Sequence, residues 1–228
     1  MKVLALSAAL AVAAAGAAQA LPSYSLTGLG DLPGGSFESQ GFGINDAGQV
    51  AGRSRAANGF RAFRWDPTTG LEDLGDLPGG TDRSDGFGIN EAGQVAGLSG
   101  ATAGIRAFRW DPDDGLLDLG VLPGGGAESQ ANGINDAGQV AGVSETASGF
   151  RAFRWDPVDG LLDIGDLPVG TEFGLGIAIN DAGQVAGRGN AATGDRAFRW
   201  DPVDGLLDLG DLPGGNDFSQ GLGINDAG

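Results

Sequence analysis

Hydrophobic and polar residues alternate within several short segments of this 228-residue chain. In the segment 41–45, Phe42 and Ile44 alternate with two glycines, and in the segment 60–65, Arg61, Phe63 and Trp65 share one face. A period of two residues indicates β-strands. Because no ten-residue window combines helical spacing with a cap, we predict an all-β protein.

Turn residues separate these strands. Asp-Ala-Gly at 46–48 predicts a tight hairpin between strands at 41–45 and 49–52, because Gly supplies a positive φ and Asp a local acceptor. A third strand at 60–65 ends in the Asp-Pro turn at 66–70, and a fourth strand follows at 71–74. Four short strands joined by tight turns match one blade of a β-propeller.

The same pattern returns every 45 residues, which indicates a repeat architecture. Its markers are an Ile-Asn pair beginning at Ile44, Ile89, Ile134, Ile179 and Ile224, and a tryptophan at Trp65, Trp110, Trp155 and Trp200. The predicted repeats are 41–85, 86–130, 131–175 and 176–220, preceded by a lone last strand and loop at 21–40 and followed by the start of a fifth repeat at 221–228.

We therefore predict a β-propeller of about five four-stranded blades. The last blade is expected to be incomplete, because residues 221–228 stop inside a hairpin turn, and a fragment of a longer protein is the expectation. A parallel β-solenoid, with two coils filling each repeat, is the alternative. The direct hairpin turns favour antiparallel pairing and hence the propeller.

The N-terminal residues 1–20 have the pattern of a signal peptide. Lys2 precedes an apolar run, and Ala18-Gln19-Ala20 supplies the small residues of a cleavage site. A buried N-terminal helix is the alternative. We expect cleavage after Ala20 and a mature repeat domain, 21–228, that is secreted or exposed at the cell surface. No later apolar run approaches the length of a membrane span.

The charge balance excludes some partners. The net charge is −17, and Lys2 is the only lysine, so nucleic acids and anionic membranes are poor partners. The chain has no Cys, so packing and repetition, or an ion that needs no thiolate ligands, must stabilise it in place of disulfides.

The chain lacks both His and Cys. The usual catalytic bases and the thiol nucleophiles are therefore missing. A glycosidase would need unique carboxylates converging on one pocket, whereas the acids here largely follow the repeat. Where the repeat breaks, Val121 stands at the position of Asp76, and Val169 at the position of Gly79. We expect no enzyme and assign no catalytic, cofactor-binding or metal residue; part of a secreted hydrolase is an alternative.

The recurrent tryptophans and arginines each admit a structural and a functional interpretation. One Trp per repeat, beside a Phe on the same strand face, is typical of packing between blades, although a sugar-stacking platform is the alternative. We expect Arg61 and Arg64 to pair with acids such as Asp66 or Asp73, rather than to bind the anionic groups of a ligand.

The recurrent acids could bind Ca²⁺, which prefers several hard oxygen ligands. The candidates are Asp46, Asp66, Asp73 and Asp76 with their equivalents, but most of them sit in turns, where Asp accepts hydrogen bonds from backbone amides. A calcium-dependent structural or adhesive array is therefore an alternative function. No EF-hand spacing is present.

The repeats differ most in two sets of segments. The first set is 53–60, 98–105, 143–150 and 188–195, and the second is 36–40, 81–85, 126–130, 171–175 and 216–220. Varied loops on a rigid scaffold are typical of a recognition surface, although drift of unconstrained loops would produce the same pattern. We predict a non-catalytic scaffold that binds a protein or a glycan through these loops.

The repeated blocks Gly-Ile-Asn-Asp-Ala-Gly-Gln-Val-Ala-Gly, Arg-Ala-Phe-Arg-Trp and Asp-Leu-Gly-Asp-Leu-Pro-Gly-Gly resemble the HAF family of bacterial extracellular repeats. The likeness covers almost everything from Leu26 to Gly228. The family's His is replaced by Arg61, Arg106, Arg151 and Arg196, and Leu-Pro-Gly-Gly replaces a shorter Leu-Gly-Gly. The resemblance implies an exported, propeller-like protein, often with a PEP-CTERM sorting signal that these residues lack; it implies no activity.

Overall fold

The computed structural model describes residues 25–228 except 169, 171 and 215–216, so the predicted signal peptide lies outside the described residues. The described part contains sixteen strands and no helix. The strands are β1 (Gly34–Ile44), β2 (Val50–Ala56), β3 (Phe60–Asp66), β4 (Gly70–Gly75), β5 (Ser84–Ile89), β6 (Val95–Ala101), β7 (Gly104–Asp111), β8 (Gly115–Gly120), β9 (Ser129–Ile134), β10 (Val140–Glu145), β11 (Phe150–Asp156), β12 (Gly160–Asp163), β13 (Gly174–Ile179), β14 (Val185–Ala191), β15 (Gly194–Asp201) and β16 (Gly205–Gly210).

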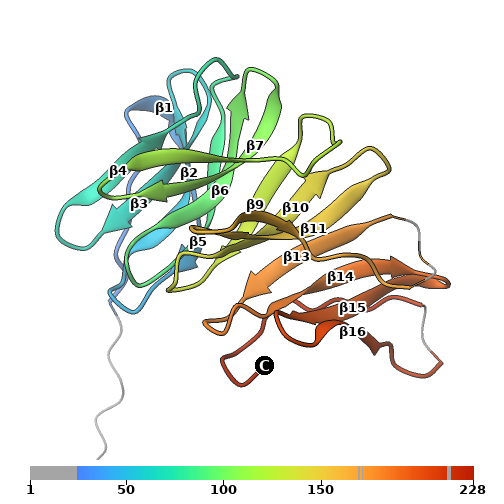
Figure 1. The fold of residues 1–228 in the computed structure, drawn as a ribbon. Helices are drawn as coiled ribbons and strands as arrows, with labels where there is room; N and C mark the ends of the chain where they lie inside the picture. The colour runs from blue at the N-terminus through green and yellow to red at the C-terminus, as the bar shows by residue number, and fades with distance from the viewer. Residues whose placement is uncertain (1–24, 169, 171, 215–216) are drawn as a thin grey trace, which may run out of the picture.

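Each run of four consecutive strands forms one antiparallel sheet, in the order β1-β2-β3-β4 and so on to β13-β14-β15-β16. These four sheets are the blades, and they pack face to face in sequence order along an arc (Figure 1). The first strands β1, β5, β9 and β13 contact one another in turn and form the inner edge of the arc. The predicted four-stranded blades are confirmed, and the solenoid alternative is wrong because neighbouring strands pair antiparallel.

The predicted hairpin turn between the first two strands forms as expected. Gly48 has a φ of 77°, and the Asn45 side-chain oxygen accepts a hydrogen bond from the Gln49 backbone N–H at 2.9 Å. The Gln49 amide then donates to Asp66 at 2.8 Å. That bond ties the turn between the first two strands to the turn between the last two, so one end of each blade is held by its own side chains.

The core lies within and between the blades. Phe63, Phe108, Phe153 and Phe198 are fully buried at equivalent positions. Glycine is required opposite them, because a Cβ added at Gly52 would lie 2.7 Å from the Phe63 ring and 2.0 Å from the Gln40 carbonyl oxygen. Trp110 of the second blade packs on Ala51, Ala62 and Leu74 of the first. Packing between blades is thereby confirmed as the role of this tryptophan.

The ends of the described chain differ from the prediction. Residues 25–33 and 221–228 contain no strand, and residues 34–40 of the predicted N-terminal loop belong to β1. The physical reason is pairing: a fourth strand pairs with the third strand of its own blade and a first strand with the second. No such partner strand lies beside either segment in the described residues. The described residues therefore form four complete blades, as predicted for the four whole repeats, and residues 221–228 add no strand of a fifth.

Candidate functional site

The two ends of each blade carry different kinds of sequence. Because the strands are antiparallel, the turns between the first two and the last two strands lie at one end. The turns between the second and third strands, and the connections between blades, lie at the other. All the segments that vary between repeats fall at this second end, which we call the loop face. It comprises residues 53–60, 98–105, 143–150, 188–195, 36–40, 81–85, 126–130, 172–175 and 217–220.

The two variable sets contact each other across the loop face. Phe60 and Arg83 form a parallel β-bridge between blades, as do Phe150 and Phe173. The Gly100 N–H donates to the Arg83 carbonyl oxygen at 2.8 Å. Loops that are far apart in the sequence therefore form one continuous surface, which the sequence could not show.

The opposite end carries the repeated motif and is structural. The Asn45 side-chain amide donates to the Asn90 carbonyl oxygen of the next blade at 2.9 Å. The same bond joins Asn90 to Asn135, Asn135 to Asn180 and Asn180 to Asn225. Since buried amides are costly to leave unpaired, these bonds fix the register of each blade on the next. The most prominent motif of the sequence is therefore a blade-to-blade connection.

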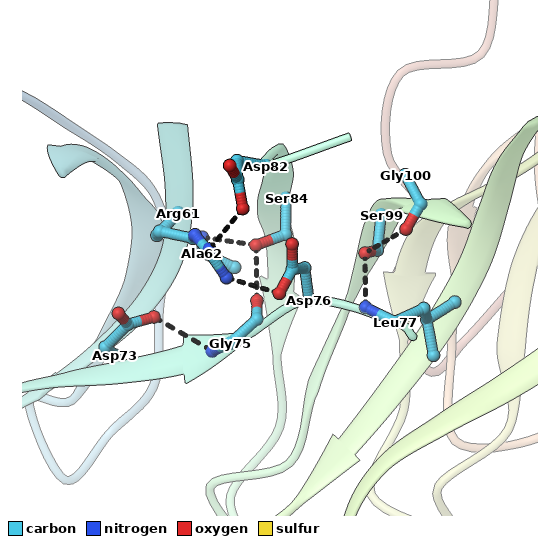
Figure 2. Close-up of polar contacts among 10 residues, drawn as sticks. All are labelled: Arg61, Ala62, Asp73, Gly75, Asp76, Leu77, Asp82, Ser84, Ser99 and Gly100. Carbon is cyan, nitrogen blue, oxygen red and sulfur yellow. Dashed lines mark hydrogen bonds and ion pairs between the residues drawn. The ribbon is translucent and has the colours of Figure 1, made fainter. Parts of the chain in front are cut away.

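The candidate calcium ligands have separate structural roles. Asp66 accepts hydrogen bonds from the Gln49 amide and from the Thr68 N–H at 2.8 Å, and the Gln49 bond in particular holds the pKa of the Asp66 carboxyl far below its usual range. Asp73 accepts from the Gly75 N–H at 2.9 Å, and Asp76 pairs with Arg61 (Figure 2). Within the described ranges, no cluster of three or more acidic, His or Cys residues could hold a metal ion.

Acid pairing is confirmed for the first-blade arginines, but with other partners than Asp66 and Asp73. Arg61 pairs with Asp76 and, at 2.9 Å, with Asp82 (Figure 2). Arg64 pairs with Glu72 at 3.0 Å. The difference arises because Asp66 and Asp73 cap backbone amides of their own turns.

The sequence analysis missed a second role of the Arg-Trp pair. The Arg64 guanidinium lies over the Trp110 ring, 4.7 Å from its centroid, and Arg109 and Arg154 lie in the same way over Trp155 and Trp200. A cation over an aromatic face is attracted by the ring quadrupole. The signal was present in the sequence, since every repeat that has a following repeat carries both residues.

The loop face has a pocket of about 160 Å³ between the second and third blades. Apolar side chains from four strands contribute Leu98, Ile105, Val143 and Phe150, and polar ones contribute Arg83, Glu128, Ser129 and Gln130. All these positions belong to the variable segments. An apolar pocket with a few polar groups is the usual form of a small binding site.

Two charged clusters flank this pocket on the loop face. On the first-blade side, Asp85 is 1% exposed and pairs with Arg53 at 3.3 Å and with Arg83 at 3.1 Å. Arg53 also lies 4.6 Å from the centroid of the Phe60 ring. A buried carboxylate held by two guanidinium groups orders these loops, because an unpaired buried charge would be very costly.

On the fourth-blade side, Arg188 pairs with Asp195 at 2.6 Å. Its guanidinium lies 5.3 Å from the Phe173 ring and 5.7 Å from the Phe218 ring. The two clusters occupy equivalent places but use different acids, so the loop face lacks the symmetry of the opposite end.

No helix of the described residues has the length and apolarity needed to cross a membrane.

Comparisons with known proteins show the fold and no family. No family model matches the chain, and no curated protein matches it. TolB from Acinetobacter baumannii aligns with a TM-score of 0.55 and 13% identity, covering 75% of this chain and 43% of that one. A putative TolB from Agrobacterium tumefaciens aligns with a TM-score of 0.56 and 16% identity, covering 82% and 70%. This chain thus spans less than half of the Acinetobacter protein.

The expectation that the protein is not an enzyme is corrected by a third structure. A gluconolactonase from Xanthomonas campestris aligns with a TM-score of 0.47 and 14% identity, covering 86% of this chain and 68% of that one. The expected absence of activity is therefore withdrawn; it had relied on the absence of His and Cys and on acids that largely follow the repeat. A likeness at this level assigns no lactonase activity to this chain. The two TolB structures show that this chain has a β-propeller fold.

Proposed function

We propose that the protein is an exported β-propeller recognition module, secreted or held at the cell surface, that binds a protein ligand through its loop face. The observation that carries this proposal is the convergence of both variable segment sets on one face, around one apolar pocket. Export is supported by the signal-peptide pattern of residues 1–20. The HAF resemblance is consistent with the same location.

The rigidity of the scaffold supports a recognition role. The Asn connections at the opposite end and the buried Phe of each blade hold the strands in register. Loops that extend from such a scaffold keep their relative positions while their side chains vary. A pre-ordered surface loses little conformational entropy on binding, which favours affinity.

The chemistry of the pocket favours a protein over a glycan. Trp110, Trp155 and Trp200 are buried between blades, so they offer no stacking platform for a sugar ring. The pocket instead combines aliphatic walls such as Leu98 and Val143 with Arg83 and Glu128. That arrangement suits an apolar side chain flanked by charged residues, as in an exposed peptide segment.

Two matched variants test the proposal. Val143→Asp places a charge in the pocket, whereas Val158→Asp places one at the opposite end, where Val158 is 90% exposed. Both variants and the unaltered protein would be screened against a displayed peptide library and a glycan array, with circular dichroism to confirm folding. We expect selected peptides to bind Val143→Asp about tenfold or more weakly and Val158→Asp unchanged.

Other outcomes would reject the proposal. Equal binding by the two variants would remove the loop-face pocket from recognition. Ligands found only on the glycan array would identify a sugar-binding module instead. Selected peptides that lack an apolar residue would contradict the assigned pocket chemistry.

A further inference from the structure

Four equivalent arginines stand on the third strands of the blades, and three of them have carboxylate partners. Arg61 pairs with Asp76 and Asp82 (Figure 2). Arg151 pairs with Asp166 at 3.0 Å and Glu172 at 3.3 Å, and Arg196 pairs with Asp211 at 3.6 Å. The acids come from the connection that leads into the next blade. The usual role of this arginine is therefore to fix that connection.

The second blade breaks this arrangement at both partner positions. Val121 replaces the acid equivalent to Asp76, and Ala127 replaces the acid equivalent to Asp82. The side chain of Arg106 consequently forms none of the ion pairs found within the described ranges, and it donates none of the hydrogen bonds found there. A guanidinium carries five N–H donors in a planar fork that matches a carboxylate. Those donors are available to a ligand.

A pocket of about 210 Å³ lies beside this arginine. Its apolar lining comes from Leu77 and Pro78 of the connection between the first two blades, from Ala101 at the end of β6 and from Ala103 of the turn that follows. The volume is below the roughly 300–1,000 Å³ of sites for drug-sized molecules. The pocket therefore suits a ligand with few heavy atoms and a short apolar group.

The pocket also contains one acid. Asp118 lines it, and one oxygen of its carboxylate accepts a hydrogen bond from the Gly120 N–H at 2.8 Å. The pocket thus presents a cation at Arg106, an anion at Asp118 and an apolar wall. A free multivalent anion would be repelled by Asp118 and by the net charge of −17. A ligand of no net charge is not repelled.

We propose that this pocket binds a small apolar α-amino acid. Its carboxylate pairs with the Arg106 guanidinium, its ammonium group with the Asp118 carboxylate, and its side chain contacts Leu77, Pro78 and the two alanines. The two opposite charges of the ligand replace the intramolecular acids that the other blades supply. The site also lies on the loop face but shares no lining residue with the first pocket, so its test does not depend on the proposed recognition function.

The side-chain Nε–Hε signal of Arg106 provides a direct readout. The full chain, labelled with ¹⁵N-arginine, would be titrated at constant ionic strength with L-leucine, with 4-methylpentanoate and with isoamylamine. We expect a saturable shift with leucine, a clearly weaker effect with the carboxylate that lacks the ammonium group, and none with the amine. An equal response to 4-methylpentanoate would overturn the amino-acid assignment, and no saturable response to leucine would overturn the site.

Matched variants at one position provide the control. Val121→Asp restores the intramolecular partner found in the other blades, and we expect it to weaken leucine binding about tenfold or more. Val121→Leu keeps the position apolar and should bind leucine as the unaltered protein does. Arg106→Gln should abolish binding, with circular dichroism to show that the fold is kept. If Val121→Asp binds leucine as tightly as Val121→Leu, the proposal is wrong.

Discussion

At the residue scale, one glycine at the start of the fourth blade departs from the repeat. Ser84, Ser129 and Ser219 each accept a hydrogen bond at 2.9 Å from an alanine N–H of the preceding blade. Gly174 occupies the equivalent place and offers no acceptor. Nearby, the buried Oδ1 of Asp166 has no hydrogen-bond partner, and burial raises the pKa of the Asp166 carboxyl. In the other blades the same serine hydroxyl also donates to a glycine carbonyl oxygen, that of Gly75, Gly120 or Gly210. The missing hydroxyl therefore removes both of these bonds from the contact between the third and fourth blades.

Replacing this glycine with serine should stabilise the protein. A Cβ at Gly174 would lie 3.0 Å from the Ala152 nitrogen, so a serine hydroxyl there could accept from the Ala152 N–H as the equivalent serines do. We expect Gly174→Ser to raise the free energy of unfolding by about 1 kcal/mol, measured by urea denaturation. Gly176→Ser is the control, since no equivalent blade has a serine there and its Cβ would crowd three atoms: the Gly142 carbonyl oxygen at 3.0 Å, the Gly142 nitrogen at 3.2 Å and Val185 Cγ1 at 3.3 Å. Equal effects of the two changes would contradict this account.

The carboxyls of the Asp-Pro turns predict loss of stability in acid. Hydrogen bonds lower the pKa values of Asp111, Asp156 and Asp201 in the folded state; the largest contribution comes from the Asp113 N–H, the Val158 N–H and the Gln184 amide, respectively. The unfolded chain therefore binds protons first as the pH falls below about 4. These carboxyls therefore stabilise the folded state at pH values above about 4, and their contribution is lost as the pH falls towards their lower, folded-state pKa values.

Urea denaturation between neutral and acidic pH measures this effect. We expect Asp156→Asn to show a shallower decline in unfolding free energy than the unaltered protein. Asp166→Asn should instead make the decline steeper. The pKa of Asp166 is raised in the folded state, so this carboxyl stabilises the folded protein at pH values below its unfolded pKa, and that stabilisation is lost as the pH rises through the folded pKa. Parallel curves for the two variants would show that these carboxyls do not govern the pH dependence.

At the scale of the element, the contact between consecutive blades is the unit of stability. Each internal contact contains a buried Trp under the Arg of the preceding blade, with a glycine where the chains come close. Gly93 has a φ of 74°, and a Cβ there would lie 3.0 Å from Nη1 of Arg64. Glycine is therefore favoured at this turn for two reasons: the backbone has a positive φ, and a Cβ would crowd the Arg64 side chain between the blades.

Two tryptophans at equivalent positions test this unit. Trp110→Ala removes a ring that is 6% exposed and covered by Arg64, and we expect a loss of about 3–5 kcal/mol in unfolding free energy. Trp65 is only half-buried and lies outside the core clusters, so Trp65→Ala should cost clearly less. Chemical denaturation of the two variants compares them. A similar loss in both would mean that the contact between blades adds little.

At the scale of the whole molecule, the four blades form a chain of nearest-neighbour contacts along an arc (Figure 1). Stability in such arrays is approximately a sum over units and their contacts. The inner blades are covered on both faces, whereas one face of the fourth is open. Leu209 of β16 is 54% exposed, while its equivalent Leu119 of β8 is 6% exposed.

Hydrogen exchange should reveal this gradient. We expect backbone amides of β14 and β15 to exchange faster than those of β6 and β7, because local opening exposes less apolar surface where one face is already open. Mass spectrometry of peptic fragments measures the difference. Equal protection across the two blades would indicate that the array unfolds as a single cooperative unit.

Much of this protein follows from local sequence. The two-residue alternation, the Asp-Ala-Gly and Asp-Pro turns and the 45-residue period determined the strands, the hairpins and the four-stranded blades, because these are short-range properties of the chain. The buried position of Trp110 was also predictable from its fixed place beside a Phe. The partners of Arg61 were not, since several acids lie near enough in sequence to compete.

Only the tertiary structure decided where the variable segments meet and which polar groups lack partners. Residues 53–60 and 81–85 come from different strand connections, and antiparallel pairing together with blade packing brings them to one face. Asn45 bonds to a residue in the next blade, a contact that local propensity does not encode. The sequence shows Val121 at the position of Asp76, but only the packing shows that this position and that of Ala127 supply the partners of the arginine. Local sequence therefore specifies the blades, and the packing between blades decides which distant residues meet.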